Sequence, residues 1–509
     1  MSSLDKNKTW RLVKRTKTRK VIGCRWIYRL KPGIPGVEEP RYKARLVAKG
    51  YSQRKGIDYQ EVFAPVVKHV SIRCLLSVTA NMDMKLEQLD VKTAFLHGLL
   101  EEEIYMEQPE GFVVKGKEDH VCLLEKALYG LKQAPRQWNK CFDQFVVSHG
   151  FKRSEYGHCV YIKESKGKCF IYLLLYVDDM LIASEDMKEI NIVKDLLSSR
   201  FEMKDLGATR RILGMDIERD RKGGVLTLSQ SGYIKKILQV FNMDESRSVS
   251  THIGSHFKLS AVKDDEAETL MDNIPYSNAI GSIMYAMLGT RCDLAYAVGL
   301  VSRFMSKPSM IHWTAVKWVL RYLKGAQDRK IVFMKKVSID TTPSVDRHGH
   351  VKDFKIEGFC DSDFSSDLDI SLSISGYVFT SGGTVISWKS SLQHVVALST
   401  TEAEYMALVE AVKEVIWLKG LTEEFGFKQD TVEIWCDSQS ALSLAKNNVH
   451  HERTKHINRR LHFIRDIVAY GEVKLSKIPT ERNPADMLTK VLPVDKFEKA
   501  LSFLNLEEH

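Results

Sequence analysis

Two neighbouring aspartates, Asp178 and Asp179, stand between two apolar strand-type runs in residues 171–184 (IYLLLYVDDMLIAS). Aspartate is a common turn former, so a plain hairpin turn is one interpretation of this pair. Carboxylates held between buried strands, however, repel each other and lose hydration unless a cation neutralises them. Oxygen ligands without His or Cys partners favour Mg²⁺ or Mn²⁺ over zinc. The segment therefore predicts a divalent-metal site.

A third carboxylate, Asp90, ends an alternating strand-type run at residues 84–90, just before a turn. Catalytic ligands often collect at strand ends. Two metal ions about 3.5–4 Å apart can lower the pKa of a sugar hydroxyl and stabilise a leaving pyrophosphate during in-line phosphoryl transfer. Asp90, Asp178 and Asp179 around two Mg²⁺ ions, with Mn²⁺ as a substitute, therefore predict nucleotide polymerisation.

A second group of acids lies in the C-terminal third. Asp361 and Asp437 each follow a short strand-type run, and Asp486 stands in the later segment NPADMLTK. Between the first two, residues 400–419 carry apolar side chains at helical spacing, with Glu404 on the inward stripe. Two acids, Asp361 and Asp437, thus again stand at strand ends, as Asp90 does.

Glu404 also has a purely structural interpretation. Thr401 and Glu404 have the spacing of a helix capping box, and Ser399 and Glu402 form another in the next register. Taken by itself, Glu404 would be a cap. Its place among the other acids keeps a functional role open.

Positive charge is concentrated at the N-terminal end. The chain carries +10 overall, whereas residues 1–50 hold 15 basic and 3 acidic side chains, or +12, which leaves −2 for the rest. Residues 8–31 and 41–49 alternate cations with β-branched and aromatic residues, which predicts a hairpin with its turn at residues 32–36. One interpretation is a solvated basic face, and the other is binding to a polyanion. The cations that would serve are Lys14, Lys17, Arg19, Arg25, Arg29, Lys43, Arg45 and Lys49.

Length and composition are those of a multidomain globular protein. At 509 residues the chain is long enough for about three domains. A content of 44% apolar and 28% charged residues excludes a wholly disordered, collagen-like or coiled-coil chain. The longest apolar run, residues 169–177, is too short for a membrane span, and the N-terminus lacks the apolar core of a secretory signal. We therefore expect an intracellular protein with no membrane partner.

Cysteines and histidines give little support to a zinc site. The nine cysteines include no C-x-x-C pair, which predicts reduced, buried thiols. Four histidines with basic neighbours but no cysteine partners predict a basic helix on nucleic-acid phosphates more than a zinc ligand set. They are His450, His451, His456 and His462.

Several motifs carry a family resemblance: LDVKTAFLHG, YMEQPEGF, ALYGLKQAPRQW, YVDDMLIAS and FEMKDLG. They resemble the reverse transcriptase of copia-type long-terminal-repeat retrotransposons, and the resemblance runs almost end to end. It implies that Asp90, Asp178 and Asp179 are the metal-binding palm carboxylates. It also implies a Pol polyprotein segment that acts on an RNA template, a DNA primer and deoxynucleoside triphosphates.

The same resemblance implies roles for residues around the incoming nucleotide. Phe95 would fill the ribose-gate position, where its ring would exclude a 2′-hydroxyl. Lys43, Arg45 and Lys49 would belong to the fingers strand that contacts the triphosphate. Gly130 would shape the template and nucleotide pocket, because a glycine lets the backbone approach closely.

In the C-terminal third, the order D, E, D, D over strand, helix, strand and helix resembles ribonuclease H. Carried over, Asp361, Glu404, Asp437 and Asp486 would hold two magnesium ions that activate a water. The substrate would be the RNA strand of an RNA·DNA hybrid, distinguished from DNA by its 2′-hydroxyls. His456 would help product release.

Together these observations predict an α+β multidomain chain. A right-hand polymerase with fingers, palm and thumb would precede an α/β ribonuclease H-like domain with a mixed sheet. The expected domains are fingers and palm at residues 1–228, thumb and connection at 229–350, and the ribonuclease H-like domain at 351–509. The resemblance also implies a cytoplasmic location inside a virus-like particle.

The leading hypothesis is an RNA-directed DNA polymerase with linked ribonuclease H. An alternative is a catalytically inactive retrotransposon remnant that only binds nucleic acid, since no D-[ST]-G protease motif, nucleocapsid knuckle or integrase zinc pattern is found. A third possibility is ribonuclease activity alone. The sequence leaves the oligomeric state open.

Overall fold

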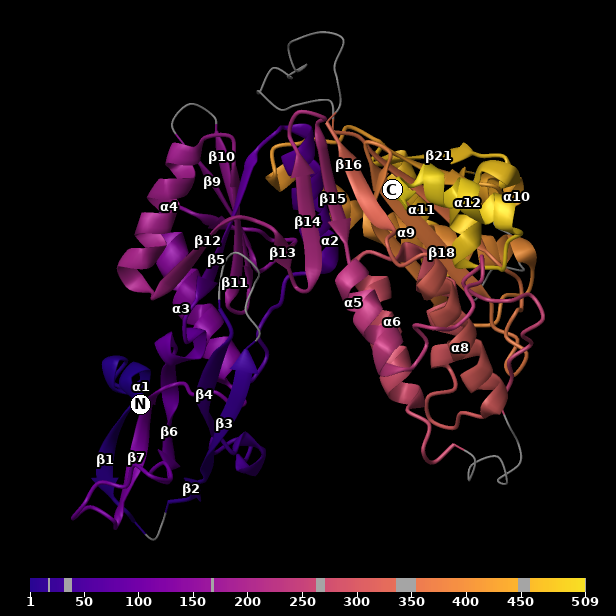
Figure 1. Ribbon diagram of the computed structural model, residues 1–509. Coiled ribbons are helices and arrows are strands. Elements are labelled where there is room, and N and C mark those ends of the chain that lie inside the picture. Colours follow the sequence, from indigo (N-terminus) through magenta and orange to yellow (C-terminus); the bar gives the residue numbers. More distant parts are fainter. Residues whose placement is uncertain are drawn as a thin grey trace. The chain divides into compact units, whose positions relative to one another are not determined.

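The computed structural model describes residues 1–16, 19–31, 39–165, 169–261, 271–335, 354–446 and 458–508 (Figure 1). Contacts group the chain into two compact units. Unit 1 comprises residues 1–67 and 86–208, and unit 2 comprises residues 68–85 and 209–509. Among the described residues, none of the helices combines the length and apolar character needed to cross a membrane.

The largest sheet of unit 1 positions the residues around Asp178. Its strand order is β12-β5-β11-β10-β9-β8. The strands are β5 (Lys85–Val91), β8 (Lys152–Arg153), β9 (Val160–Glu164), β10 (Phe170–Tyr176), β11 (Asp179–Ser184) and β12 (Met203–Ala208). Strands β10 and β11 form the hairpin that the two apolar runs predicted, with Tyr176 paired to Asp179.

Two helices, α3 (Ala134–Ser148) and α4 (Met187–Arg200), cover one face of this sheet (Figure 1). Leu89 and Val91 of β5 pack with both helices in a single core. Because successive strand residues point to opposite faces, Asp90 of β5 lies on the face away from the helices. The helices thus fix the sheet from one side and leave the other side for chemistry.

Unit 1 also contains two smaller sheets. One has the order β1-β7-β6-β2, and the other pairs β3 with β4. The strands are β1 (Trp10–Lys14), β2 (Val21–Ile22), β3 (Cys24–Lys31), β4 (Arg41–Ala48), β6 (Leu99–Met106) and β7 (His120–Lys126), with the short helices α1 (Ser2–Lys6), η1 (Gly50–Ser52) and η2 (Ala94–His97).

The predicted N-terminal hairpin is correct for its second half and wrong for its first. Strands β3 and β4 pair antiparallel over their full length. Strand β1, however, pairs with β7, because Leu12 packs into the core that contains Cys122 and Leu124. Lys17 and the turn at residues 32–36 lie outside the described residues.

One sheet of unit 2 has the order β13-β14-β15-β16-β22. Its strands are β13 (Arg211–Ile212), β14 (Met215–Asp220), β15 (Val225–Ser229), β16 (Lys330–Met334) and β22 (Leu506–Glu507). The helices nearby in the sequence are α5 (Ser231–Val240), α6 (Tyr276–Gly289), η4 (Cys292–Leu294), α7 (Ala295–Ser302) and α8 (Met310–Gly325).

Helix α2 (His69–Asn81) belongs to unit 2, although it stands between two segments of unit 1 in the sequence. Residues 71–80 are buried on every side of the helix, and Arg73 among them is 3% exposed. Its guanidinium donates hydrogen bonds to the carbonyl oxygens of Leu288, Gly289 and Ile386. These bonds satisfy a buried cation and fasten α2 to α6 and to β19 (Thr384–Leu392).

The last sheet of unit 2 is mixed, with the order β19-β18-β17-β20-β21. Strands β17, β18 and β19 are antiparallel, whereas β20 and β21 run parallel to β17. The strands besides β19 are β17 (Ile356–Ser362), β18 (Ile374–Ser381), β20 (Val432–Cys436) and β21 (Val473–Lys477), and the helices are α9 (Thr400–Glu424), α10 (Gln439–Lys446), α11 (Asn458–Ala469), η6 (Thr480–Arg482), η7 (Pro484–Leu488) and α12 (Val494–Phe503).

These sheets and helices confirm the predicted α+β fold class and the mixed sheet of the C-terminal domain. The helix predicted at residues 400–419 begins at Thr400 and continues to Glu424. Asp486, expected on a helix, lies on the short 3-10 helix η7, which Pro484 opens and the Asn483 side chain caps. The predicted domain boundaries at residues 228 and 350 stay a prediction.

Candidate active sites

The first carboxylate set consists of Asp90, Asp178 and Asp179, at the end of β5 and in the β10–β11 turn. The turn is fixed by two hydrogen bonds: the Val91 N–H donates to the Asp178 carbonyl (2.9 Å), and the Trp138 indole N–H donates to the Val177 carbonyl (2.5 Å). Val177 itself has φ +57°, a left-handed conformation that costs free energy for a β-branched residue. The surrounding core therefore holds this turn in one geometry.

Asp178 and Asp90 lie close enough to interact electrostatically. Burial raises the pKa of Asp178, the charge of Asp90 raises that pKa further, and the cations Lys43 and Arg45 of β4 oppose the rise. Asp179 accepts a hydrogen bond from the Gln88 amide (3.5 Å). The structure thus groups Asp90 and Asp178 with two of the three predicted cations, and it places Asp179 beside Gln88.

The third predicted cation, Lys49, has different neighbours. Its backbone N–H donates to the Gly23 carbonyl (2.8 Å), and its charge acts on Cys24. Both contacts are at the end of the β3–β4 pair where Cys24 lies opposite Ala48. Of the three cations, Lys43 and Arg45 are therefore the ones placed to act near Asp178.

An aromatic pair lies beside the first carboxylate set. Phe95 contacts Tyr129 with ring centroids 4.9 Å apart, and the Arg45 guanidinium carbon is 5.6 Å from the Tyr129 ring centre. Burial raises the pKa of Tyr129, and the charges of Asp178 and Asp90 raise it further while Arg45 lowers it. Tyr129 is a site residue that the sequence analysis missed, although it stands inside the quoted motif ALYGLKQAP next to Gly130.

Gly130 occupies a position that only glycine fits. Its φ of +91° disfavours other residues, and a Cβ there would lie 2.2 Å from the Ala48 carbonyl oxygen and 2.6 Å from the Val47 Cγ1. The Ala48 N–H donates to the Tyr129 carbonyl (2.8 Å). The loop carrying Tyr129 and Gly130 is therefore pressed against the end of β4 that follows Arg45.

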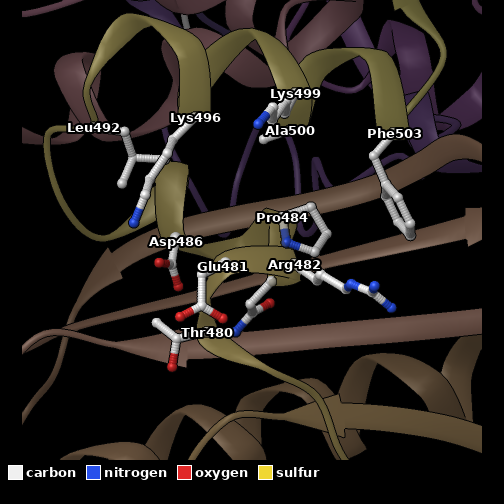
Figure 2. A pocket seen from close by; sticks show the side chains of 11 residues that line it. Thr480, Glu481, Arg482, Pro484, Asp486, Leu492, Lys496, Lys499, Ala500 and Phe503 are labelled. Atoms are coloured by element: carbon white, nitrogen blue, oxygen red, sulfur yellow. The ribbon is translucent and has the colours of Figure 1, made fainter.

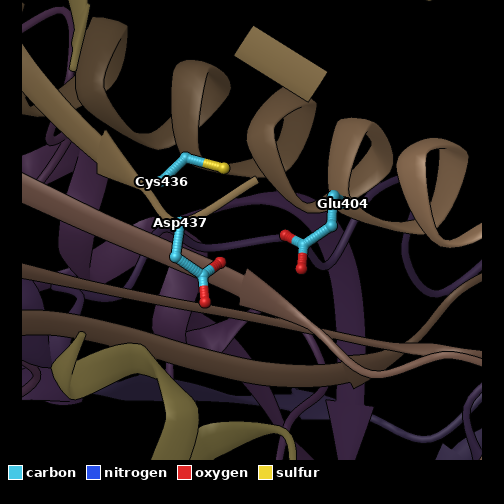
Figure 3. A group of neighbouring side chains, drawn as sticks. All are labelled: Glu404, Cys436 and Asp437. Atoms are coloured by element: carbon cyan, nitrogen blue, oxygen red, sulfur yellow. The ribbon is translucent and has the colours of Figure 1, made fainter. Parts of the chain in front are cut away.

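The second carboxylate set consists of Asp361, Glu404, Asp437 and Asp486. Oxygen atoms of Asp361, Asp437 and Asp486 lie within 4.8 Å of one another. A ligand atom of Asp437 also groups with Glu404 and the Cys436 thiol within the same limit (Figure 3). The structure therefore brings all four predicted carboxylates together around Asp437.

The sheet topology explains this convergence. Asp361 is at the C-terminal part of β17, and Asp437 directly follows β20, the parallel neighbour of β17. Parallel strands bring their carboxyl ends to the same edge of a sheet. Glu404 reaches this edge from the first turns of α9, which packs on β17 and β18, and Asp486 reaches it from η7.

The N-terminus of α9 is capped by Ser399 and Glu402, and not by Glu404. The Ser399 side chain accepts a hydrogen bond from the Glu402 N–H, and the Glu402 carboxylate accepts one from the Leu398 N–H (2.8 Å). This places the cap in the register of Ser399 and Glu402. Glu404 is therefore available to the second carboxylate set.

Repulsion and burial dominate the electrostatics of the second set. Burial raises the pKa of Asp361 to about 7, with Asp486 adding to the rise and Lys490 opposing it. Burial raises the pKa of Glu404 to about 10, and the charge of Asp361 contributes further. Burial also raises the pKa of Asp486. Ionising these buried carboxylates together is therefore unfavourable, and a bound cation would lower this electrostatic cost.

Lys490 neutralises part of this negative charge, and it is a residue that the sequence analysis did not identify. Its ammonium is 3.4 Å from an Asp361 oxygen and 3.2 Å from an Asp486 oxygen. Thr489 also donates its hydroxyl to Asp361. The signal was available, since Lys490 stands four residues after Asp486 in the motif NPADMLTK.

The residues present fit a divalent cation. Glu404 Oε2 and Asp486 Oδ1 are buried and accept no hydrogen bond from the described residues. The group of Asp361, Asp437 and Asp486 offers only oxygen, which suits Mg²⁺ or Mn²⁺, while Cys436 adds a softer donor beside Glu404.

The predicted histidine cluster contributes one described residue. His462 is exposed on α11. His450, His451 and His456 lie outside the described residues. Their predicted roles stay a prediction.

Comparisons with known proteins show which family this chain resembles. The family described as reverse transcriptase (RNA-dependent DNA polymerase) matches residues 7–255. The retrovirus-related Pol polyprotein from transposon TNT 1-94 of Nicotiana tabacum is 50% identical over 98% of this chain. A transposon Ty5-1 protein of Saccharomyces cerevisiae is 31% identical over 64% of this chain and is covered over its whole length. The chain belongs to the copia-type Pol family.

The copia-type Pol relatives are much longer than this chain. It covers 36% of the tobacco protein and 31% of the Pol polyprotein from transposon RE2 of Arabidopsis thaliana, to which it is 39% identical. The resemblance drawn from the motifs is confirmed. The chain contains the reverse transcriptase domain of a copia-type Pol polyprotein.

Solved structures show low similarity. A foamy viral protease-reverse transcriptase in complex with double-stranded DNA aligns with 94% of this chain and 68% of its own, at 10% identity and a TM-score of 0.47. A ribonuclease H1 from compost aligns with 29% of this chain and 98% of its own, at 20% identity and a TM-score of 0.22.

Proposed function

We propose that this chain is an RNA-directed DNA polymerase with a linked ribonuclease H that degrades the RNA of RNA·DNA hybrids. The observation that carries the proposal is the presence of two separate carboxylate sets, one in each unit. Its substrates are an RNA template, a DNA primer, deoxynucleoside triphosphates and the hybrid that synthesis leaves behind. The proposed location is cytoplasmic, inside a virus-like particle.

At the first site, the chain's residues would bind and orient the nucleotide. Lys43 and Arg45 are cations next to Asp178 and would bind the triphosphate. The Phe95 ring, held against Tyr129, would lie where a 2′-hydroxyl must go and so favour deoxynucleotides. Gly130 allows its loop to approach β4 closely enough to form the wall of this site.

At the second site, the residues would hold the RNA strand next to a water. Lys490 keeps Asp361 and Asp486 in place through its two ion pairs, and Thr489 orients the buried Asp361 carboxylate. The 2′-hydroxyls of the hybrid would distinguish the strand to be cut.

Divalent metal is the cofactor that we propose for both sets, and the second set is the one whose ligand atoms converge. Asp90, Asp178 and Asp179 would hold it at the first site, and Asp361, Glu404, Asp437 and Asp486 at the second. Bound Mg²⁺ or Mn²⁺ supplies charge for the reacting phosphate and lowers the pKa of the attacking hydroxyl or water.

Primer extension tests the polymerase. The purified chain is given an RNA template, a labelled DNA primer and nucleotides, with Mg²⁺ or with EDTA, beside an Asp178→Asn, Asp179→Asn double variant. We expect extension that needs the metal and is lost in the double variant. Extension by the double variant would overturn the site assignment.

The alternative, an inactive remnant that binds nucleic acid, predicts a different result. A folded chain that binds the hybrid in a salt-dependent manner but neither extends nor cleaves it would support the remnant. Hybrid cleavage without extension would support ribonuclease activity alone.

A further inference from the structure

A cavity of about 310 Å³ opens between α12 and the segment that carries η6 and η7 (Figure 2). We call it the α12 pocket. Its size is at the lower end of the range for small-molecule sites, which is the scale of one nucleotide. Its lining residues are Thr480, Glu481, Arg482, Asn483, Pro484, Asp486, Leu492, Lys496, Lys499, Ala500 and Phe503.

The α12 pocket carries an excess of positive charge. Three exposed cations line it, Arg482, Lys496 and Lys499, against the carboxylates Glu481 and Asp486. Among the described residues, none of the three cations has a carboxylate within ion-pair distance. Unpaired cations around a hollow are suited to bind a phosphate.

One end of the pocket offers an aromatic surface. Phe503 is 48% exposed although its ring contacts Phe359 edge-on, with centroids 5.2 Å apart. In Figure 2, the Phe503 ring and the Arg482 side chain lie at the same end of the cavity. An exposed ring held by a neighbour is a surface on which a base can stack.

The other end of the pocket meets the second carboxylate set. Asp486 is 7% exposed, lines the cavity and has an oxygen, Oδ1, without a hydrogen-bond partner among the described residues. Figure 2 shows Lys496 extending from α12 toward Asp486. A ligand in this pocket would therefore adjoin the scissile position of the second site.

The wall formed by α12 is held firmly from behind. Phe497 is fully buried and packs against His252 and Tyr322. Glu498, on the same helix, accepts two hydrogen bonds from the guanidinium of Arg329 (2.8 and 2.9 Å). The lysines of α12 are thus presented from a preorganised surface, which lowers the entropic cost of binding.

We infer that the α12 pocket binds one nucleotide of the RNA strand next to the bond that the second site cuts. The phosphate lies on Lys496 and Lys499, and the base stacks on Phe503 beside Arg482. This inference rests on the proposed ribonuclease function, because that function supplies the strand.

Photo-cross-linking on the full chain tests the inference without requiring catalysis. An RNA strand with 4-thiouridine at successive positions is annealed to DNA, bound in EDTA, irradiated and mapped by peptide mass spectrometry. We expect one register of the strand to cross-link to residues 496–503. Phe503→Leu, which keeps the apolar contact with Phe359, should lower that yield by about fivefold or more.

A Lys496→Gln, Lys499→Gln double variant should lower the same yield and weaken its dependence on salt, because two phosphate contacts are lost. The matched control is Lys428→Gln with Lys446→Gln, two exposed lysines of unit 2 outside the pocket, and it should leave the yield unchanged. Absence of cross-links at residues 496–503, or equal yields in all variants, would overturn the inference. A chain that cross-links there but never cleaves would instead count against the proposed function.

Discussion

The two carboxylate sets balance their charge in different ways. In the first, Asp90 at the end of β5 and Asp178 in the β10–β11 turn are half-buried, and their countercharges, Lys43 and Arg45, come from a separate pair of strands. In the second, Asp361 and Asp486 are buried, and Lys490, their nearest cation, stands four residues after Asp486.

This difference indicates which charged ligand each site is suited to bind. At the first site the cations and the acids come from separate strands, so a polyanionic substrate can bind between them. The second site has more buried carboxylate than one lysine can neutralise, so its folded state itself favours a bound cation. The second site should therefore link metal binding to stability more strongly than the first.

Crossed substitutions should separate the two sites most clearly. Asp178→Asn should lower primer extension by at least about 100-fold and leave hybrid cleavage intact, because a metal ligand is lost at one site only. Asp437→Asn should do the reverse. Both rates are measured on the same preparations with Mg²⁺.

Each variant serves as the other's control for folding. If Asp437→Asn abolished extension as strongly as cleavage, the two sets would not be independent sites. Equal loss in both assays from either variant would remove the basis of the comparison.

Sugar selection offers the next test. Phe95→Val shortens the ring that would block a 2′-hydroxyl, so discrimination against ribonucleotides should fall by about 10- to 200-fold. The measurement is kcat/KM for paired deoxy- and ribonucleotides on one template. Hybrid cleavage should not change.

Tyr129→Phe is the matched control, because it keeps the ring that contacts Phe95. It should preserve discrimination. Unchanged selectivity in Phe95→Val would assign Phe95 to the core alone.

The sequence predicted the acids better than their surroundings. Asp178 and Asp179 interrupt apolar runs, and Asp361 and Asp437 follow similar short strands, so strand-type runs located all four. Glu402 and Glu404 both have the capping-box spacing, so spacing alone does not decide which of them caps the helix. Tertiary packing decided it, because α9 directs Glu404 to the sheet edge.

Other features depend on contacts between distant segments. The first basic strand pairs with β7, about a hundred residues later in the chain, and no local pattern specifies such a partner. Likewise, α2 belongs to unit 2 through hydrogen bonds from Arg73 to residues more than two hundred positions away. Long-range pairing of this kind is decided by packing, which a single sequence does not encode locally.

The pH dependence of stability should expose the strain in the second site. In EDTA, the folded pKa values of Asp361 (about 7) and Glu404 (about 10) exceed their unfolded values near 4, so the folded chain binds more protons between these limits. Its unfolding free energy should therefore fall as pH rises from 5 to 8, by about 2 kcal/mol or more. The measurement is urea denaturation read by hydrogen exchange in peptides of β17 and β20.

Two conditions sharpen this result. Mg²⁺ at pH 8 should restore the lost stability, because it neutralises the ionised acids. Glu404→Gln, which removes one titrating group, should flatten the pH dependence in EDTA. Stability that is constant or rises over this pH range would contradict the assigned charge state.

Replacing Lys490 should give the smallest effect and the most specific one. Its side chain is 40% exposed and its ammonium is the countercharge of Asp361 and Asp486, so Lys490→Met should destabilise the metal-free chain by only about 1 kcal/mol. The same ammonium repels an incoming cation, so the variant should bind Mg²⁺ more tightly, by about fivefold. The Mg²⁺ concentration that restores half of the stability measures this.

Lys413→Met removes an exposed lysine that pairs with Glu410 in the same unit and should leave the Mg²⁺ requirement unchanged. The two lysines differ in the other charges that lie next to their partner carboxylates. Glu410 also pairs with a second cation, Lys389, whereas the carboxylates of Asp361 and Asp486 repel each other. A Mg²⁺ affinity that stays constant or falls in Lys490→Met would mean that Lys490 does not oppose metal binding. The cation of the second site would then be part of its binding arrangement, as Lys43 and Arg45 are at the first site.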